Sequence, residues 1–77
     1  MHDYNRELIK IISEKTGVEI DEISPESYFE EDLNIPELEL IEILTELEEK
    51  YQVDLLEERE NLTTVQDLSD LLTELVE

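Results

Sequence analysis

Residues 32–44 read DLNIPELELIEIL, a turn that leads into a helix with an apolar stripe. Pro36 suits the first position of that helix, because its ring fixes φ and it has no N–H to leave unpaired. Apolar residues of the core stripe then recur at intervals of three and four: Leu40, Ile43 or Leu44, Leu47 and Tyr51. The spacing predicts an amphipathic helix over about 36–51, with Leu38 and Ile41 to one side of its buried stripe.

Before this helix, the pattern predicts one more helix and a long connection. A helix from about Asp3 or Tyr4 to Thr16 has Asp3 as a candidate N-cap and Gly17 as a candidate left-handed C-cap. The connection over residues 18–35 is longer than an ordinary loop, so we expect its own apolar side chains to pack it in place. The apolar residues are Leu8, Ile9, Ile11 and Ile12 in the helix, and Val18, Ile20, Ile23, Tyr28, Phe29 and Leu33 in the connection.

After the central helix, a short helix is permitted within LLEERENL, residues 55–62. The last helix is predicted to start at TTVQDL, where Thr63 with Gln66 or Thr64 with Asp67 would form a capping box. Its apolar stripe consists of Val65, Leu68, Leu71, Leu72 and Leu75. No segment has the alternating pattern of a strand, so the predicted class is all-α.

Composition favours one small folded domain over residues 1–77. So acidic a chain could be disordered, but its leucines and isoleucines fall at helical spacing and give it a face to bury. The 24 acidic and 5 basic residues leave a net charge of −19, which repels nucleic acid phosphates and anionic lipid headgroups. The expected partners are therefore basic protein surfaces or cations, and we expect a monomer.

Several classes of function are disfavoured by residues that the chain lacks. There is no cysteine and only one histidine, so a disulfide framework, a thiolate metal site and a nucleophilic enzyme are not expected. No apolar run approaches the roughly 18 residues of a membrane span. The opening MHDYNREL lacks the basic and apolar regions of a signal peptide. We expect a soluble, cytoplasmic protein that is not an enzyme.

Three segments together resemble the acyl carrier protein family. ISPESYFEEDL (23–33) is similar to the family's loop into its second helix, and LIEILTELEEKYQVDL (40–55) to that helix and the following turn. LTTVQDLSDLL (62–72) is similar to the passage from the third helix to the fourth. Order, spacing and length agree over essentially the whole chain. The resemblance implies a four-helix acyl-carrier-like bundle, with three main helices and a short third one.

The chain departs from the family where the prosthetic arm is attached. The family motif is D-L-G-x-D-S-L, in which 4′-phosphopantetheine is esterified to the serine; here Asn34, Pro36 and Glu37 replace Gly, Asp and Ser. A carboxylate cannot form that phosphodiester, so we expect the attachment site to be lost and 4′-phosphopantetheine to be absent. Ser24 and Ser27, upstream in the loop, are interpreted as turn and capping residues rather than substitutes.

Two interpretations of Glu37 remain open. In the simpler one, its carboxylate is stabilised by the helix macrodipole, typically by about 0.3–1 kcal/mol. In the other, Glu37 provides a permanent negative charge where the phosphate of the arm would lie. Leu40 likewise has two interpretations: ordinary core, or a larger side chain that fills space an acyl chain would need.

The second helix also carries the candidate partner-binding surface. The resemblance implies that this helix docks basic partner surfaces, with apolar residues at the positions of Leu38 and Ile41 entering shallow pockets. An acidic run is often only a solvated helix face, but here it would also steer a basic partner. The candidate acidic residues are Glu39, Glu42, Glu46, Glu48 and Glu49.

The leading hypothesis is therefore a carrier-like interaction module for fatty acid or polyketide-type enzymes, or for a carrier-dependent complex. One alternative is a conventional acyl carrier protein whose serine was changed to glutamate, although Asn34 and Pro36 also depart from the motif and favour natural divergence. Another is an acidic helical protein that binds divalent cations weakly. Acidic clusters at 30–32, 48–49 and 57–58 could hold Ca²⁺ or Mg²⁺, but they match no calcium-binding loop, so no specific metal site is expected.

Overall fold

The computed structural model describes residues 4–76, and over these residues it contains helices but no strand. The all-α class is thus confirmed, including a short helix before the last one. An additional short 3₁₀ helix lies in the long connection. The elements are α1 (Tyr4–Thr16), η1 (Ile20–Glu22), α2 (Glu37–Tyr51), η2 (Leu56–Asn61) and α3 (Val65–Val76).

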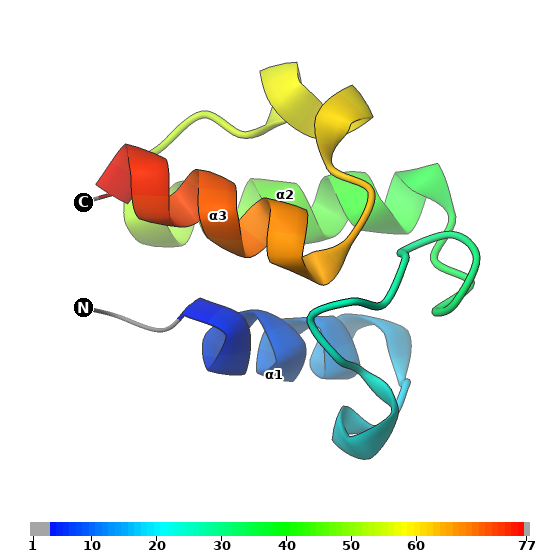
Figure 1. The fold of residues 1–77 in the computed structure, drawn as a ribbon. Coiled ribbons are helices and arrows are strands. Elements are labelled where there is room, and N and C mark those ends of the chain that lie inside the picture. Colours follow the sequence, from blue (N-terminus) through cyan, green and yellow to red (C-terminus); the bar gives the residue numbers. More distant parts are fainter. Residues whose placement is uncertain (1–3, 77) are drawn as a thin grey trace.

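The three α-helices do not simply alternate in direction (Figure 1). Helices α2 and α3 run the same way, and both run opposite to α1. This arrangement is possible because the segment that contains η2 carries the chain back along α2 before α3 begins.

Local capping interactions set the helix ends. Gly17 ends α1 at φ 83°, as predicted, and its N–H donates to the Ser13 carbonyl over 2.9 Å. At α3, the Thr64 Oγ accepts the Asp67 N–H and the Asp67 carboxylate accepts the Thr64 N–H, both over 3.1 Å, which is the second of the two predicted capping boxes. The proposed Asp3 cap lies outside the described residues.

Pro36 is one position earlier in the helix than expected. The prediction placed it as the first helical residue, but its ψ of 160° is extended, so it is the N-cap. Its carbonyl accepts the Leu40 N–H over 3.0 Å, the first bond of the helix. The fixed φ of proline, here −69°, suits this position as well.

The core lies between the three α-helices. Most of the apolar residues predicted for the stripes of these helices are buried there. The predicted loop anchors Ile23, Phe29 and Leu33 are buried as well, and Ile35, which was not predicted, is 2% exposed. The residues with no exposed surface are Leu8, Ile12, Ile43, Leu44, Leu47, Leu55, Val65, Leu68 and Leu72.

Three predicted core residues are instead at the surface: Ile20, Tyr28 and Leu75 are 55%, 46% and 45% exposed. Tyr28 forms an isolated bridge with Thr64, and in this extended backbone side chains alternate, so its neighbours are buried and it points outward. Ile20 belongs to η1, none of whose residues is buried. Leu75 lies in the last turn of α3, one residue before the helix ends.

The long connection is tied to the start of α3 by backbone hydrogen bonds. The Phe29 N–H donates to the Thr63 carbonyl over 3.0 Å, and the Val65 N–H donates to the Ser27 carbonyl over 3.1 Å. A third bond, of 2.8 Å, runs from the Gln66 N–H to a carbonyl in the connection. These bonds hold the segment that leads into α2 against the end of the η2 segment.

A further set of contacts joins the start of α1 to the end of α2. The Tyr51 hydroxyl donates to the Glu7 carboxylate, and the Tyr51 ring meets Tyr4 edge to face with centroids 5.5 Å apart. Burial, followed by the bond to Glu7, raises the pKa of the Tyr51 phenol above its usual value.

Candidate docking site at the start of α2

A well-held turn positions the start of α2. The Tyr28 carbonyl accepts the Asp32 and Leu33 N–H groups over 3.0 and 3.1 Å, and the Asp32 carboxylate accepts the Tyr28 N–H over 2.8 Å. Asn34 then adopts a left-handed backbone, with φ 54°. The buried Ile35 donates its N–H to a carbonyl of the connection over 2.8 Å, so the chain enters α2 from a fixed point.

Glu37 is the first residue of α2 and is exposed. It lies at the helix end where unpaired N–H groups and the macrodipole favour negative charge. The next residue, Leu38, is 70% exposed, the largest value for any large apolar side chain among residues 4–76. A carboxylate and an unburied leucine are thus presented together at this end of the helix.

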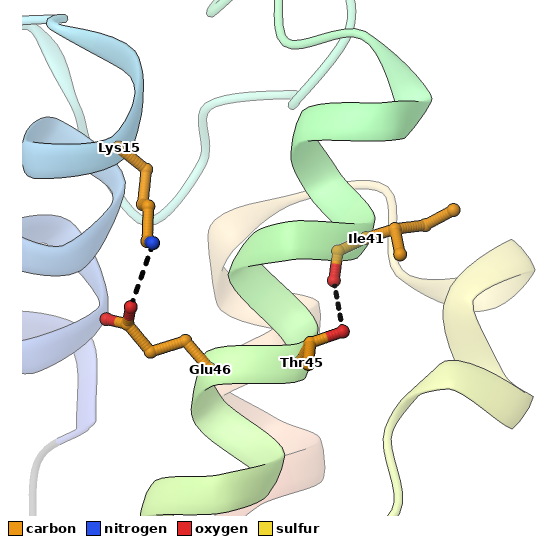
Figure 2. Close-up of polar contacts among 4 residues, drawn as sticks. All are labelled: Lys15, Ile41, Thr45 and Glu46. Atoms are coloured by element: carbon orange, nitrogen blue, oxygen red, sulfur yellow. Dashed lines mark hydrogen bonds and ion pairs between the residues drawn. The ribbon is translucent and has the colours of Figure 1, made fainter.

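The predicted partner-binding residues occupy different parts of the α2 surface. Glu42 and Glu49 are exposed, whereas Glu39 and Ile41 are half-buried. Figure 2 shows the Ile41 side chain pointing away from α1, with the Thr45 hydroxyl donating to the Ile41 carbonyl over 2.8 Å.

Glu46 faces the opposite way and is already paired within the chain. Its carboxylate lies 3.0 Å from the Lys15 ammonium, across the gap between α2 and α1 (Figure 2). The hydrogen bond and the negative charge of Glu46 raise the pKa of Lys15. A partner that uses Glu46 would have to compete with this internal cation.

Glu48 has a structural role that sequence reasoning missed. Its carboxylate accepts the Leu55 and Leu56 N–H groups over 2.6 and 3.1 Å and thereby caps η2. The only sequence signal for this role is an acidic residue eight positions before the start of a short helix. Contact of Glu48 with a partner stays a prediction, but two backbone donors already engage its carboxylate.

Two depressions border this surface. A shallow one of about 400 Å³ lies over α2 and α1 and includes Ile41, Glu42 and Glu49. A second, more enclosed one of about 280 Å³ lies between α2 and η2, and we name it the α2–η2 cleft. It is lined by Tyr28, Phe29, Glu30, Glu31, Ile35, Glu37, Leu40, Ile41, Arg59, Glu60, Leu62 and Thr63.

Leu40 is therefore not wholly ordinary core. It is half-buried and packs against the core cluster, yet it also forms part of the cleft wall. Its side chain packs on the core on one side and lines the cleft on the other, and the interpretation that it fills space an acyl chain would need stays a prediction.

The two serines of the connection are used as expected for turn residues. The Ser27 Oγ accepts the Ser24 N–H over 3.0 Å, and the two hydroxyls lie 3.1 Å apart. Ser27 is buried. Its hydroxyl is thus committed to the turn.

Two kinds of structure are absent from residues 4–76. Within this range, no three His, Cys, Asp or Glu side chains are grouped so that they could hold a metal ion. None of the helices in the same range is long and apolar enough to cross a membrane.

Most of the chain is similar in sequence to known proteins. Residues 6–72 match the family model described as "Phosphopantetheine attachment site". An acyl carrier protein of Buchnera aphidicola is 34% identical over 77 residues, which span 99% of each chain. An acyl carrier protein of Rubrobacter xylanophilus is 38% identical over 66 residues, which span 84% of this chain and 82% of that protein.

Proposed function

The chain belongs to the acyl carrier protein family, whose members are non-catalytic carriers, and from this membership we propose that it is a carrier-like docking protein without the prosthetic arm. Its partners are cytoplasmic enzymes of fatty acid, polyketide or related thioester pathways, or a complex that uses a carrier-like subunit. It binds them through the exposed face of α2.

The carboxylate of Glu37 is the observation that carries this proposal. Glu37 stands at the first residue of α2, where the family motif has its attachment serine, and a carboxylate offers no hydroxyl to esterify. The residues at this position therefore do not fit covalent attachment of 4′-phosphopantetheine. Ser27 is buried in its turn, which argues against a substitute site there.

The α2 surface supports docking. Leu38 is available as an apolar anchor, and Glu42 and Glu49 line the shallow depression together with Ile41 and the Lys15–Glu46 ion pair. An apolar anchor with charges around it is the usual layout of a protein interface. The carboxylates would accelerate encounter with a basic partner surface.

A conventional carrier is the second candidate. The matching family model is named for the attachment site, which favours a conventional carrier in which only the attachment serine was changed to glutamate. Asn34 and Pro36 favour the first candidate, since a single change of serine to glutamate would have left the motif's Gly and Asp in place.

The test is the intact mass of the protein from its native cells, beside Glu37→Ser incubated with coenzyme A and a broad-specificity phosphopantetheinyl transferase. We expect an unmodified native protein and a modified Glu37→Ser variant. Glu39→Ser is the control, because it places a hydroxyl on the same helix but away from the motif position. A native protein that carries the arm would contradict the proposal.

A binding experiment separates the two interpretations of Glu37. The Kd of a thioester-pathway enzyme that binds arm-bearing carriers is measured for the native chain, for Glu37→Gln and for Leu38→Ala. If Glu37 substitutes for the phosphate charge, Glu37→Gln weakens binding about 1.5- to 5-fold, the range of an exposed ion pair. If Glu37→Gln leaves the Kd unchanged while Leu38→Ala weakens binding, Glu37 does not substitute for the phosphate. Its carboxylate then only stabilises the start of α2.

A further inference from the structure

The α2–η2 cleft has an apolar floor. The residues of this floor are not among those of the exposed α2 face that we propose to bind partners. This floor consists of Phe29, Ile35 and Leu62, which line the cleft and are each at most 5% exposed. Leu40 and Ile41 of α2 add half-buried apolar walls. Its volume of about 280 Å³ is just below the roughly 300–1,000 Å³ of pockets that hold whole small molecules. The cleft is thus of a size for one long side chain or a short ligand.

The rim of the cleft is strongly acidic. Glu30, Glu31, Glu37 and Glu60 all line it, and all four are exposed. Among the described residues that line the cleft, Arg59 is the only basic one. A rim with four carboxylates and one guanidinium disfavours an anionic ligand such as a free fatty acid and favours a cationic one.

An apolar floor below an acidic rim matches the two parts of a long basic side chain. Arginine and lysine lay their methylene stems along apolar surface and keep their charged heads at the polar edge. Arginine is also enriched among the residues that dominate interface binding energy. A neutral lipid would fill the floor but leave the rim carboxylates without a counter-charge.

The cleft adjoins the docking surface. Glu37 lines it at the start of α2, and Ile41 lines both the cleft and the shallow depression on the other side of the helix. A partner that lies across the exposed face of α2 therefore passes the mouth of the cleft.

We propose, as an extension that rests on the docking function above, that the α2–η2 cleft receives one arginine or lysine side chain of the partner. Arg59 restrains this insertion, because it lines the same cleft and its positive charge repels an incoming cation. Its Nη1 donates to the Leu56 carbonyl over 3.1 Å, which keeps the side chain close to η2.

The test uses n-butylguanidinium as a probe for an arginine side chain, with pentanoate as an anionic probe of similar length. Backbone amide shifts of the full-length protein are followed by NMR at fixed ionic strength. We expect saturable shifts at Ile35 and Leu62 with n-butylguanidinium and none with pentanoate. Stronger shifts with pentanoate would identify a site for acyl chains and overturn the proposal, as would no shifts with either probe.

Two variants of equal charge separate a specific site from general attraction to an acidic protein. Glu60→Gln removes a rim carboxylate, and Glu22→Gln removes an exposed one in η1, outside the cleft and the α2 surface. We expect the first to weaken probe binding about 1.5- to 5-fold and the second to leave it unchanged. Arg59→Gln is expected to strengthen binding by a similar factor. Equal effects of Glu60→Gln and Glu22→Gln would overturn the proposal.

These outcomes differ from those that test the proposed function. If the transferase modifies Glu37→Ser and Leu38→Ala weakens binding of the thioester-pathway enzyme while n-butylguanidinium leaves the cleft unchanged, only the cleft proposal fails. If the native chain carries the arm, the docking proposal fails whatever the probe does.

Discussion

At the scale of single residues, Asn34 determines how the chain turns into α2. It adopts φ 54°, a left-handed conformation that costs most L-residues about 1–2 kcal/mol and that asparagine and glycine tolerate best. The family motif has glycine here, so the replacement by asparagine preserves the turn. The departure at residue 34 therefore leaves the geometry before Glu37 intact.

We predict that Asn34→Ala lowers the free energy of unfolding by about 1 kcal/mol, whereas Asn34→Gly does not lower it, because only alanine has a Cβ that resists the left-handed backbone. Urea denaturation at fixed ionic strength measures the difference, with Glu31→Ala as an exposed control in the same loop. Equal stability of the alanine and glycine variants would show that the turn relaxes.

Asp67 is the residue for which a pH effect is expected. Hydrogen bonds from the Thr63 hydroxyl and from the Thr63 and Thr64 N–H groups lower its pKa below the usual 3.8. The folded chain thus binds this proton less tightly than the unfolded chain. Its stabilising contribution is complete above about pH 3.8 and is lost as pH falls through the lower folded pKa.

We therefore predict that Asp67→Asn destabilises the protein most near neutral pH and that the difference from the native protein shrinks below about pH 4. Denaturation curves of both proteins at a series of pH values give this difference, and other carboxylates cancel in the comparison. A difference that stays constant down to pH 2 would contradict the lowered pKa.

At the scale of the elements, η2 depends on α2 through one side chain. The Glu48 carboxylate provides acceptors for two N–H groups at the start of η2, and a short 3₁₀ helix has little internal hydrogen bonding of its own. The position of η2 in turn sets the wall of the α2–η2 cleft that carries Arg59 and Glu60.

We predict that Glu48→Ala costs about 1–3 kcal/mol of unfolding free energy, because it leaves partly buried donors without their acceptor. Glu49→Ala, an exposed neighbour, is expected to change stability by less than about 0.5 kcal/mol. Urea denaturation compares the two, and amide hydrogen exchange at Leu55 and Leu56 should accelerate in the first variant only. Similar costs for both variants would mean that general charge, not the cap, accounts for the effect.

At the scale of the whole molecule, self-repulsion opposes folding. A net charge of −19 on 77 residues is confined to a particle of radius of gyration 11.2 Å. The Debye length falls from about 30 Å at 0.01 M salt to about 8 Å at 0.15 M, so added salt screens charges across the whole molecule.

We predict that the Tm rises by at least about 4 °C over this salt range, the shift that about 1 kcal/mol produces in a small domain. CaCl₂ at matched ionic strength should give the same rise as NaCl, since residues 4–76 contain no grouped ligands for a metal ion. A clearly larger rise with millimolar Ca²⁺ would instead favour specific cation binding.

Much of this fold could be predicted from the sequence, because local interactions determine it. The apolar spacing of residues 36–51, the glycine after α1 and the Thr64–Asp67 box act within one or two helical turns, so their consequences are written in short segments. Net charge and the glutamate at residue 37 are likewise direct properties of the sequence. The sequence by itself thus determined the helices and the acidic surface. It also excluded attachment of 4′-phosphopantetheine at residue 37.

Only the tertiary structure decided which side chains meet across long stretches of chain. In the folded chain Ile20, Tyr28 and Leu75 are exposed. Glu46 forms an ion pair with Lys15, and the Glu48 carboxylate caps η2. The tertiary structure also brought Arg59 and Glu37 to one cleft. The physical reason is that burial and pairing depend on which segments cover each helix face, and helical periodicity specifies that a face is apolar or charged without specifying what lies against it.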